Sequence, residues 1–252
     1  MAKQESIITL NGAIGNISFF KTKDGYSARK KTGVSKAEME SNPRFQRTRE
    51  NMAEFGRAAQ AAKYLRDALL ESTVGSKDRK MALRLQSAMM DVLKADTTSV
   101  RGQRNVIDGE AELLQGFEFN AAGPLSSTLL ATYIPTIDRA TGACKVSLPP
   151  YDPEKMIRFA AGATHYRFGL TAAAIDFETP GKEVKTVQSA YLPVGGGPAA
   201  LLDLQADLQP GNTHPVFLAL TLEFVQELNG QKYPLKSGEF NACALVKVDG
   251  GV

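Results

Sequence analysis

Two histidines and a few carboxylate pairs are the residues of this sequence that could perform metal or acid–base chemistry. A metal site needs three or four convergent donors, and neither His165 nor His214 has Cys, Asp or Glu around it at ligand spacing. A general acid and base need a cleft that shifts their pKa values, whereas Asp203 and Asp207 alternate with leucine and alanine in a strand pattern. We therefore expect no catalytic site and no metal site.

Sequence motifs that bind phosphate or activate a nucleophile are also missing. No GxSxG, HExxH, Walker-type or dinucleotide-binding glycine pattern occurs. The GGGP run at 195–198 precedes a strand pattern and not a helix, so it lacks the helix N-terminal amides that bind phosphate. We expect a non-enzymatic protein that needs no cofactor, and we infer no small-molecule substrate.

Basic residues are concentrated near the start of the chain. Residues 21–66 contain 12 Lys and Arg against 5 Asp and Glu, with Tyr26 and Phe45 interleaved, and nucleic-acid backbones reward such charge through counterion release. The candidate phosphate contacts are Lys21, Lys23, Arg29, Lys30, Lys31, Arg47, Arg49, Arg101 and Arg104. A nucleic-acid partner is therefore one of two alternatives.

The distribution of these charges along a helix favours a protein partner instead. Wound at a helical period, Arg47 and Arg49 are scattered among Glu50 and Glu54, which is typical of a solvated, self-paired surface. Arginine on an apolar stripe usually lays its stem on a protein contact, and Arg44 and Arg66 fall on such a stripe. We therefore rank self-association above nucleic-acid binding.

The helices that would carry this contact are predicted from caps and apolar spacing. A capping box at Ser35 predicts a short helical turn, and Asn42–Pro43 predicts the start of a long helix over 43–71. We expect this helix to pack against a second helix over 77–94 as an antiparallel hairpin. The predicted assembly interface consists of Phe45, Met52, Phe55, Arg44, Arg66, Leu83 and Met90.

The remaining elements are strands. Residues 6–31 predict a three-stranded meander with turns at Asn11–Gly12 and Lys23–Asp24–Gly25, and so small a sheet must lie on something else. About seven strand patterns after residue 116 predict an immunoglobulin-like or fibronectin-like sandwich. The predicted fold class is α+β, with residues 1–115 as the meander and helical hairpin and residues 116–252 as the sandwich. Strand parity puts Cys144 and Cys243 on opposite faces, which predicts two free thiols.

Composition and charge limit the class of protein and the location that we expect. The chain has 252 residues, of which 43% are hydrophobic and 23% charged, as in ordinary globular proteins. Residues 1–115 hold 20 Lys and Arg against 14 Asp and Glu, and the rest hold 10 against 13, so opposite charges could support head-to-tail contacts. No window resembles a signal peptide or membrane span. We expect a cytoplasmic protein without a membrane partner, within a larger particle or filament.

The first 115 residues also resemble a known group of sequences. The stretches LNGAIGNISFFKTKDGYSARKKTGVSK, NPRFQRTRENMAEFGRA and VRGQRNVIDGE are similar to bacterial and phage-associated proteins of about this length that have no assigned activity. The resemblance implies a shared architecture of glycine hairpins and an Arg-rich helix, and it supplies no site residues. Our leading hypothesis is a structural protein whose N-terminal region assembles it into an oligomer, a filament or a virion-like particle.

Overall fold

The computed structural model describes residues 2–5, 8–31, 33–179, 181–238 and 240–251. Contacts between residues divide the chain into two compact units, Met1–Arg49 and Glu50–Val252, here called the N-terminal unit and the C-terminal unit. This division differs from the predicted one at 115/116. The reason is that the helices after residue 50 bury their apolar sides against the C-terminal strands and share a core with them.

The N-terminal unit contains a four-stranded antiparallel sheet. Its strands are β1 (Ala2–Lys3), β2 (Gly12–Ile14), β3 (Ile17–Thr22) and β4 (Gly25–Lys30), in the spatial order β1-β4-β3-β2. The turn before β4 is as predicted, and Gly25 supplies its positive φ of 111°.

The first predicted strand and its turn are not where the sequence placed them. Residues 6–7 lie outside the described residues, and 8–10 form no strand. The first hairpin turns at Gly15–Asn16 instead of Asn11–Gly12, and Gly15 takes the positive φ of 55°. Glycine at either place would serve a tight turn, so the sequence pattern alone could not choose between them.

The helix starts predicted at Ser35 and Asn42–Pro43 are confirmed, whereas the helix predicted over 77–94 begins at Met81. Helix α1 (Lys36–Ser41) begins after Ser35, whose hydroxyl accepts a hydrogen bond from the Glu38 amide at 3.1 Å. The Asn42 side chain caps the 3₁₀ turn η1 (Pro43–Phe45) by accepting from the Arg44 amide at 3.1 Å. The long helix α2 follows as Gln46–Ala68. After it come α3 (Leu70–Thr73), α4 (Met81–Lys94) and the 3₁₀ turn η2 (Ala111–Leu114).

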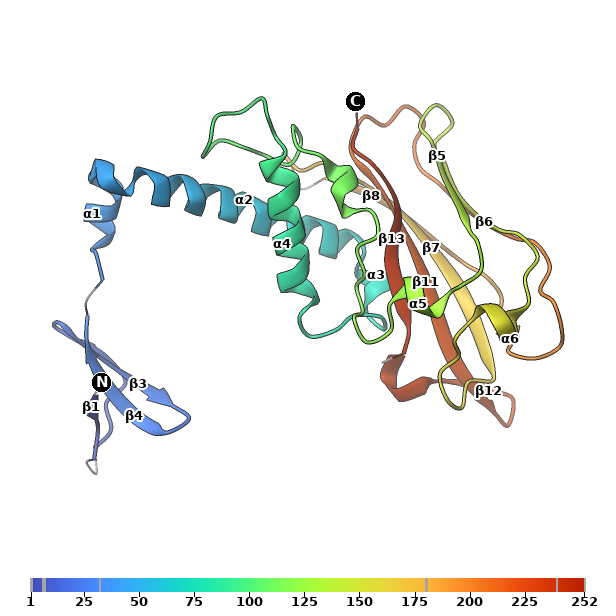
Figure 1. Cartoon of the computed structure of the whole chain (residues 1–252), viewed down its shortest axis with the longest axis horizontal. Coiled ribbons are helices and arrows are strands. Elements are labelled where there is room, and N and C mark those ends of the chain that lie inside the picture. Colours follow the sequence, from blue (N-terminus) through green and yellow to red (C-terminus); the bar gives the residue numbers. More distant parts are fainter. Residues whose placement is uncertain (1, 6–7, 32, 180, 239, 252) are drawn as a thin grey trace. The chain divides into compact units, whose positions relative to one another are not determined.

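The predicted antiparallel helical hairpin is wrong. Figure 1 shows α4 crossing α2 instead of running beside it. Both helices instead contribute to one apolar cluster with strand residues such as Phe217 and Leu245. A sheet face offers more apolar area to a short helix than another helix does, because the sheet presents several strands side by side.

The C-terminal strands form two antiparallel sheets. The smaller has the order β10-β6-β5 and comprises β5 (Ile134–Asp138), β6 (Ala143–Leu148) and β10 (Leu202–Asp207). In the larger, β11 pairs with β7, β12 and β13, while β8 and β9 pair with β7. Its strands are β7 (His165–Ile175), β8 (Lys182–Gln188), β9 (Leu192–Pro193), β11 (Val216–Leu228), β12 (Gln231–Pro234) and β13 (Ala242–Asp249). The short helices α5 (Leu125–Thr128) and α6 (Pro153–Met156) and the 3₁₀ turn η3 (Leu235–Gly238) join them.

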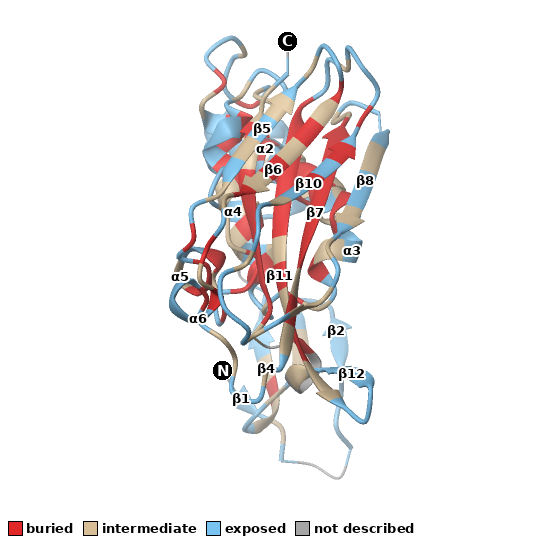
Figure 2. Ribbon diagram, turned by 90° about the vertical axis from the view of Figure 1, so that its right-hand side faces the viewer, coloured by how far each residue is buried: buried red, intermediate tan, exposed pale blue. Residues whose placement is uncertain are grey.

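The larger sheet is buried on both faces. Tyr166, Phe168 and Leu170 belong to the apolar cluster shared with the smaller sheet, whereas Ala173 and Ile175 of the same strand belong to the cluster shared with the helices. In Figure 2 the central strands are accordingly coloured as buried through much of their length. The predicted mixture of helices and antiparallel sheets is therefore present and its C-terminal sheet is curled. An immunoglobulin-like sandwich is not confirmed, because helices cover a face that such a sandwich exposes.

The two cysteines are free thiols on different faces, as predicted. Cys144 is buried between the two sheets, and Cys243 is buried between the larger sheet and the helices. The register of β11 and β13 shifts between Leu218 and Ala219. This bulge lets Val248 lie on the same side as Cys243 and Leu245, which simple alternation would not allow.

Candidate assembly surfaces

One face of the N-terminal sheet is apolar. The register pairs Ile14 with Ile17, Phe19 with Ala28, and Lys21 with Tyr26, and paired residues point to the same side of a sheet. One face therefore gathers Ile14, Ile17, Phe19, Tyr26 and Ala28, with Lys21 and Lys30 at its ends. We call this set the sheet patch.

The sheet patch is not covered by a core of the N-terminal unit. Ile14 is 62% exposed and Ile17 45% exposed. Among the described residues of Met1–Arg49, Ser27 alone is buried, and it lies on the opposite face together with Phe20 and Arg29. Figure 2 shows the strands of this unit mostly in the exposed and intermediate colours. Sequence reasoning missed the sheet patch because the misplaced first turn obscured the register of β2 and β3.

A second exposed apolar surface lies on α2, in the C-terminal unit. The predicted stripe through Met52 and Phe55 does not pack against the second helix. The residues of α2 that do enter the core are Ala58, Ala61, Ala62, Leu65 and Ala68. Alanine lets the helix approach the sheet closely, so the thin side of α2 faces inward and the bulky side faces out.

The predicted interface residues therefore separate into four groups. Met52, Phe55 and Leu83 are exposed by 59%, 57% and 69%, and we call Met52 and Phe55 the helix patch. Phe45 is half-buried and carries the guanidinium of Arg44 over its ring at 4.8 Å. Met90 packs against the chain's own core, so its assignment to an intermolecular contact is a correction. Arg66 is occupied locally, donating to the Ala62 carbonyl at 3.3 Å.

The chain's positive excess lies in the N-terminal unit. Residues 1–49 hold 10 Lys and Arg against 4 Asp and Glu, and residues 50–252 hold 20 against 23. The predicted phosphate contacts Lys21, Lys23, Arg29, Lys30, Lys31 and Arg47 are exposed. Arg49 has a structural role instead, because its guanidinium donates to the carbonyls of Met39 and Asn42 at 2.7 and 3.1 Å.

The two arginines predicted farther along the chain are parts of a folded loop. Arg101 donates to the Asn51 side chain at 2.7 Å and lies 3.5 Å from a carboxylate oxygen of Glu50. Arg104 is half-buried with its Nε out of contact with solvent, and its carbonyl accepts from Arg57. The Arg101 side chain and the Arg104 carbonyl are therefore bonded to residues of α2.

The side chains with catalytic potential do not converge. His165 lies by Thr164 at 3.0 Å and by Glu227 at 3.6 Å, whereas His214 lines a different cavity. Asp203 pairs with Lys145 at 2.8 Å and accepts from Ser147 at 2.6 Å. Within the described ranges, no three His, Cys, Asp or Glu side chains gather at a spacing that would hold a metal ion. The GGGP run is a loop before β10, as predicted.

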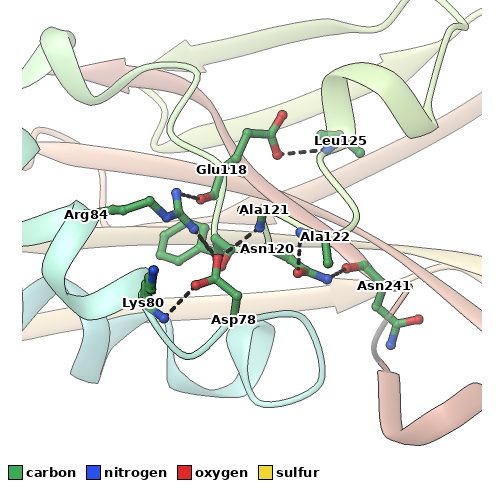
Figure 3. A network of polar contacts seen from close by, with 10 residues as sticks. Asp78, Lys80, Arg84, Glu118, Asn120, Ala121, Ala122, Leu125 and Asn241 are labelled. Carbon is green, nitrogen blue, oxygen red and sulfur yellow. Dashed lines mark hydrogen bonds and ion pairs between the residues drawn. The ribbon is translucent and has the colours of Figure 1, made fainter.

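A polar network that the sequence did not reveal joins helices, loop and sheet in the C-terminal unit (Figure 3). Asp78 accepts from Arg84 and from the amides of Lys80 and Ala121, at 2.7 and 3.0 Å for the two amides. Arg84 also donates to the Glu118 carbonyl at 2.7 Å. Burial would raise the pKa of Asp78, but these donors outweigh it and lower the pKa below its ordinary value.

The same network continues into the sheet. The Asn120 amide donates to the Asn241 carbonyl at 2.8 Å, and the Glu118 carboxylate accepts from the Leu125 amide at 2.8 Å. Its members bond to one another and to the backbone, apart from the buried Arg84 Nε, and they hold the loop between η2 and α5 in place. Residues of this kind stabilise a fold and present nothing to a substrate.

Comparison with known proteins assigns no family. No family model matches this chain, and no curated protein matches it. None of the helices in the described part of the chain is long and apolar enough to cross a membrane.

Proposed function

We propose that this protein is a non-enzymatic structural protein that assembles with copies of itself into an oligomer, filament or virion-like particle. The observation that carries the proposal is the sheet patch, an apolar face on a unit with almost no buried residue of its own. A small sheet of this kind gains stability when another surface covers its apolar face. The helix patch supports the proposal as a second uncovered apolar surface.

The charges favour a copy of the same chain as the partner. The N-terminal unit has six more basic than acidic residues, and the C-terminal unit has three more acidic than basic residues. A head-to-tail contact between copies would bring opposite charges together, and such contacts form rings or open filaments depending on the rotation. The unpaired edges of the short strands β1 and β2 would also accept a neighbour's strand.

Sedimentation velocity and negative-stain microscopy of the full chain at tens of micromolar test the proposal. We expect assemblies that weaken when salt rises from ~50 to ~500 mM, because exposed charges are screened over that range. A monomer at every concentration and salt would refute self-association.

Variants of neighbouring residues on β3 sharpen this test. Ile17→Lys puts a charge on the sheet patch, and Ser18→Lys puts the same charge on the opposite face of the same strand. We expect the first to dissociate the assembly and the second to leave it largely intact. Phe55→Lys against Leu201→Lys makes the corresponding comparison for the helix patch, since both residues are similarly exposed.

Nucleic-acid binding is the second candidate, and one feature of the sheet patch favours it. Lys21 lies 5.5 Å over the Tyr26 ring, and aromatic rings beside lysines on an open sheet can stack bases and contact phosphates. This alternative predicts retention on single-stranded DNA or RNA that falls steeply with salt and that Tyr26→Ala weakens. No retention even at ~50 mM salt would eliminate it.

A further inference from the structure

The face of the larger sheet that meets the helices changes from apolar to polar partway along its strands. On β7 the two apolar residues of this face, Ile175 and Ala173, are followed by three residues that line a polar crevice. These three are Thr171, Gly169 and Arg167. The change occurs beyond the part of the sheet that α2 and α4 cover.

The neighbouring strands change character at the same level. On β11, Phe217 and Ala219 are followed by Thr221 and Glu223. On β8, Val184 is followed by Thr186 and Gln188, and the register places these two beside Thr171 and Gly169. Three strands far apart in the sequence therefore supply one polar floor.

This floor forms a crevice of about 130 Å³ between the sheet and α3. Ser72 of α3 approaches Thr171 with 2.5 Å between their hydroxyl oxygens, and Thr171 lies 3.0 Å from the Thr186 hydroxyl. Gly169 is needed here, because a Cβ on it would come within 2.5 Å of the Thr221 hydroxyl oxygen. That hydroxyl instead donates to the Gly169 carbonyl at 3.2 Å.

The hydroxyl chain has hydrogen-bonding capacity to spare. Ser72, Thr171 and Thr186 carry three hydroxyl protons, and their two mutual contacts use two of them. One donor and several lone pairs are therefore left for something in the crevice. Thr186 is exposed and Thr171 is buried, so the chain runs from the open side of the crevice to its base.

The charges of the lining indicate what kind of molecule fits. Arg167 is already paired with Glu223, and Glu71 adds a second carboxylate to the lining. The Arg167–Glu223 pair leaves the Glu71 carboxylate as the net charge of the lining, which disfavours an anion, and an apolar group would leave the hydroxyls without partners. A neutral ligand with many hydroxyl groups satisfies all of these side chains.

We infer that this crevice is a binding site for a neutral polyhydroxyl ligand, a sugar ring or a polyol, held by the Ser72–Thr171–Thr186 hydroxyl chain with Gln188 at its open side. A ligand the size of a monosaccharide on such a shallow site binds with a Kd of roughly millimolar order. The inference does not rest on self-association, because none of the residues that line the crevice belongs to the sheet patch or the helix patch.

NMR of the threonine methyl groups in the full chain tests the inference. Glucose, galactose, N-acetylglucosamine and sorbitol are titrated separately, with sodium sulfate as the anion probe. We expect at least one neutral probe to shift the methyl signals of Thr171, Thr186 and Thr221, and sulfate to leave them in place. No shift with any neutral probe, or a shift with sulfate alone, would overturn the site.

A matched pair of variants separates the site from general surface effects. Thr186→Val removes one hydroxyl and keeps the branched shape that a strand prefers, and Thr136→Val makes the same change on exposed β5. We expect Thr186→Val to raise the Kd about tenfold, the effect of one lost hydrogen bond, and Thr136→Val to leave it unchanged. Equal Kd values for the two variants, with unchanged melting temperatures, would also refute the assignment.

Discussion

Glu54 on α2 and Gly102 in the following loop are joined by a buried hydrogen bond, in which the Glu54 carboxylate accepts from the Gly102 amide at 2.7 Å. One turn later, Arg57 donates to the carbonyls of Gly102 and Arg104 at 2.7 and 3.0 Å. A carboxylate and a guanidinium from one helix therefore bind the amide and carbonyl groups of one loop. The loop over 96–110 is in this way a fixed part of the C-terminal unit.

Replacing Glu54 should destabilise the C-terminal unit. Glu54→Ala leaves the Gly102 amide without its acceptor in a buried place, which costs about 1–3 kcal/mol, whereas Glu54→Gln keeps an acceptor oxygen and should lose less. Urea denaturation measures the free energy of unfolding of each variant. Asp67→Ala, an exposed position on the same helix, is the control. A loss no greater for Glu54→Ala than for Asp67→Ala would contradict the assignment.

Two glycines with similar φ angles should respond differently to alanine. Gly102 has φ +87° and Gly116 has φ +84°, so a side chain strains the backbone at both. At Gly102 a Cβ would also lie 2.8 Å from the Glu50 Cγ, whereas at Gly116 nothing lies within 4 Å. Gly102→Ala should therefore lower the melting temperature more than Gly116→Ala, as differential scanning calorimetry can show. Equal shifts in melting temperature would contradict the close contact between Gly102 and α2.

Asp96 should make the stability depend on pH in the acid range. Burial would raise the pKa of Asp96, but hydrogen bonds from the amides of Ser99 and Asn105 and from Thr98 lower it well below its ordinary value. The stabilisation by the Asp96 carboxylate is therefore full above the unfolded-state pKa, and it is lost as the pH falls from there through the lower folded-state pKa.

The variant Asp96→Asn tests this dependence. An asparagine side chain has one acceptor oxygen, so it cannot accept from the Asn105 amide and also from Thr98 and Ser99. This variant should therefore be less stable than the wild type at neutral pH. Urea denaturation from pH 7 to pH 2 should show the difference between the two proteins shrinking as the pH falls. A difference that stays constant down to pH 2 would show that the carboxylate charge is not responsible.

The two thiols should be inert in the folded protein. Burial, with a smaller contribution from Asp207, raises the pKa of Cys144 to about 11, and burial raises the pKa of Cys243 as well. The reactive form is the thiolate, so a thiol reagent at pH 8 should label neither residue until the protein is unfolded in guanidinium chloride. Rapid labelling of one thiol in the native protein would show that the buried layer around that cysteine opens to solvent.

Local signals predicted the helix starts at Ser35 and Asn42 and the strand alternation, because the residues that determine them are neighbours in the chain. Ser35 and Asn42 cap the helices they were expected to cap, and the parity of Cys144 and Cys243 follows from period two within one strand each. In each of these cases the structure depends on a few consecutive residues.

The errors arise where the partner of an element decides its orientation. The apolar spacing of α2 favoured Met52 and Phe55 as packing residues, yet the sheet accepts the alanine side of this helix. The sheet patch depends on whether the first hairpin turns at Asn11–Gly12 or at Gly15–Asn16. The polar crevice depends on the register of β7, β8 and β11, which no local pattern contains.

The layer between helices and sheet imposes an order on synthesis. The helical side chains of this layer, up to Leu93, leave the ribosome long before Phe217 and Leu245, which cover them. At ordinary translation rates the interval from Leu93 to Leu245 is roughly 8–30 s. During that time the hydrophobic side of the nascent helices is exposed to solvent. Chain fragments that stop before β11 should therefore need a chaperone to stay in solution.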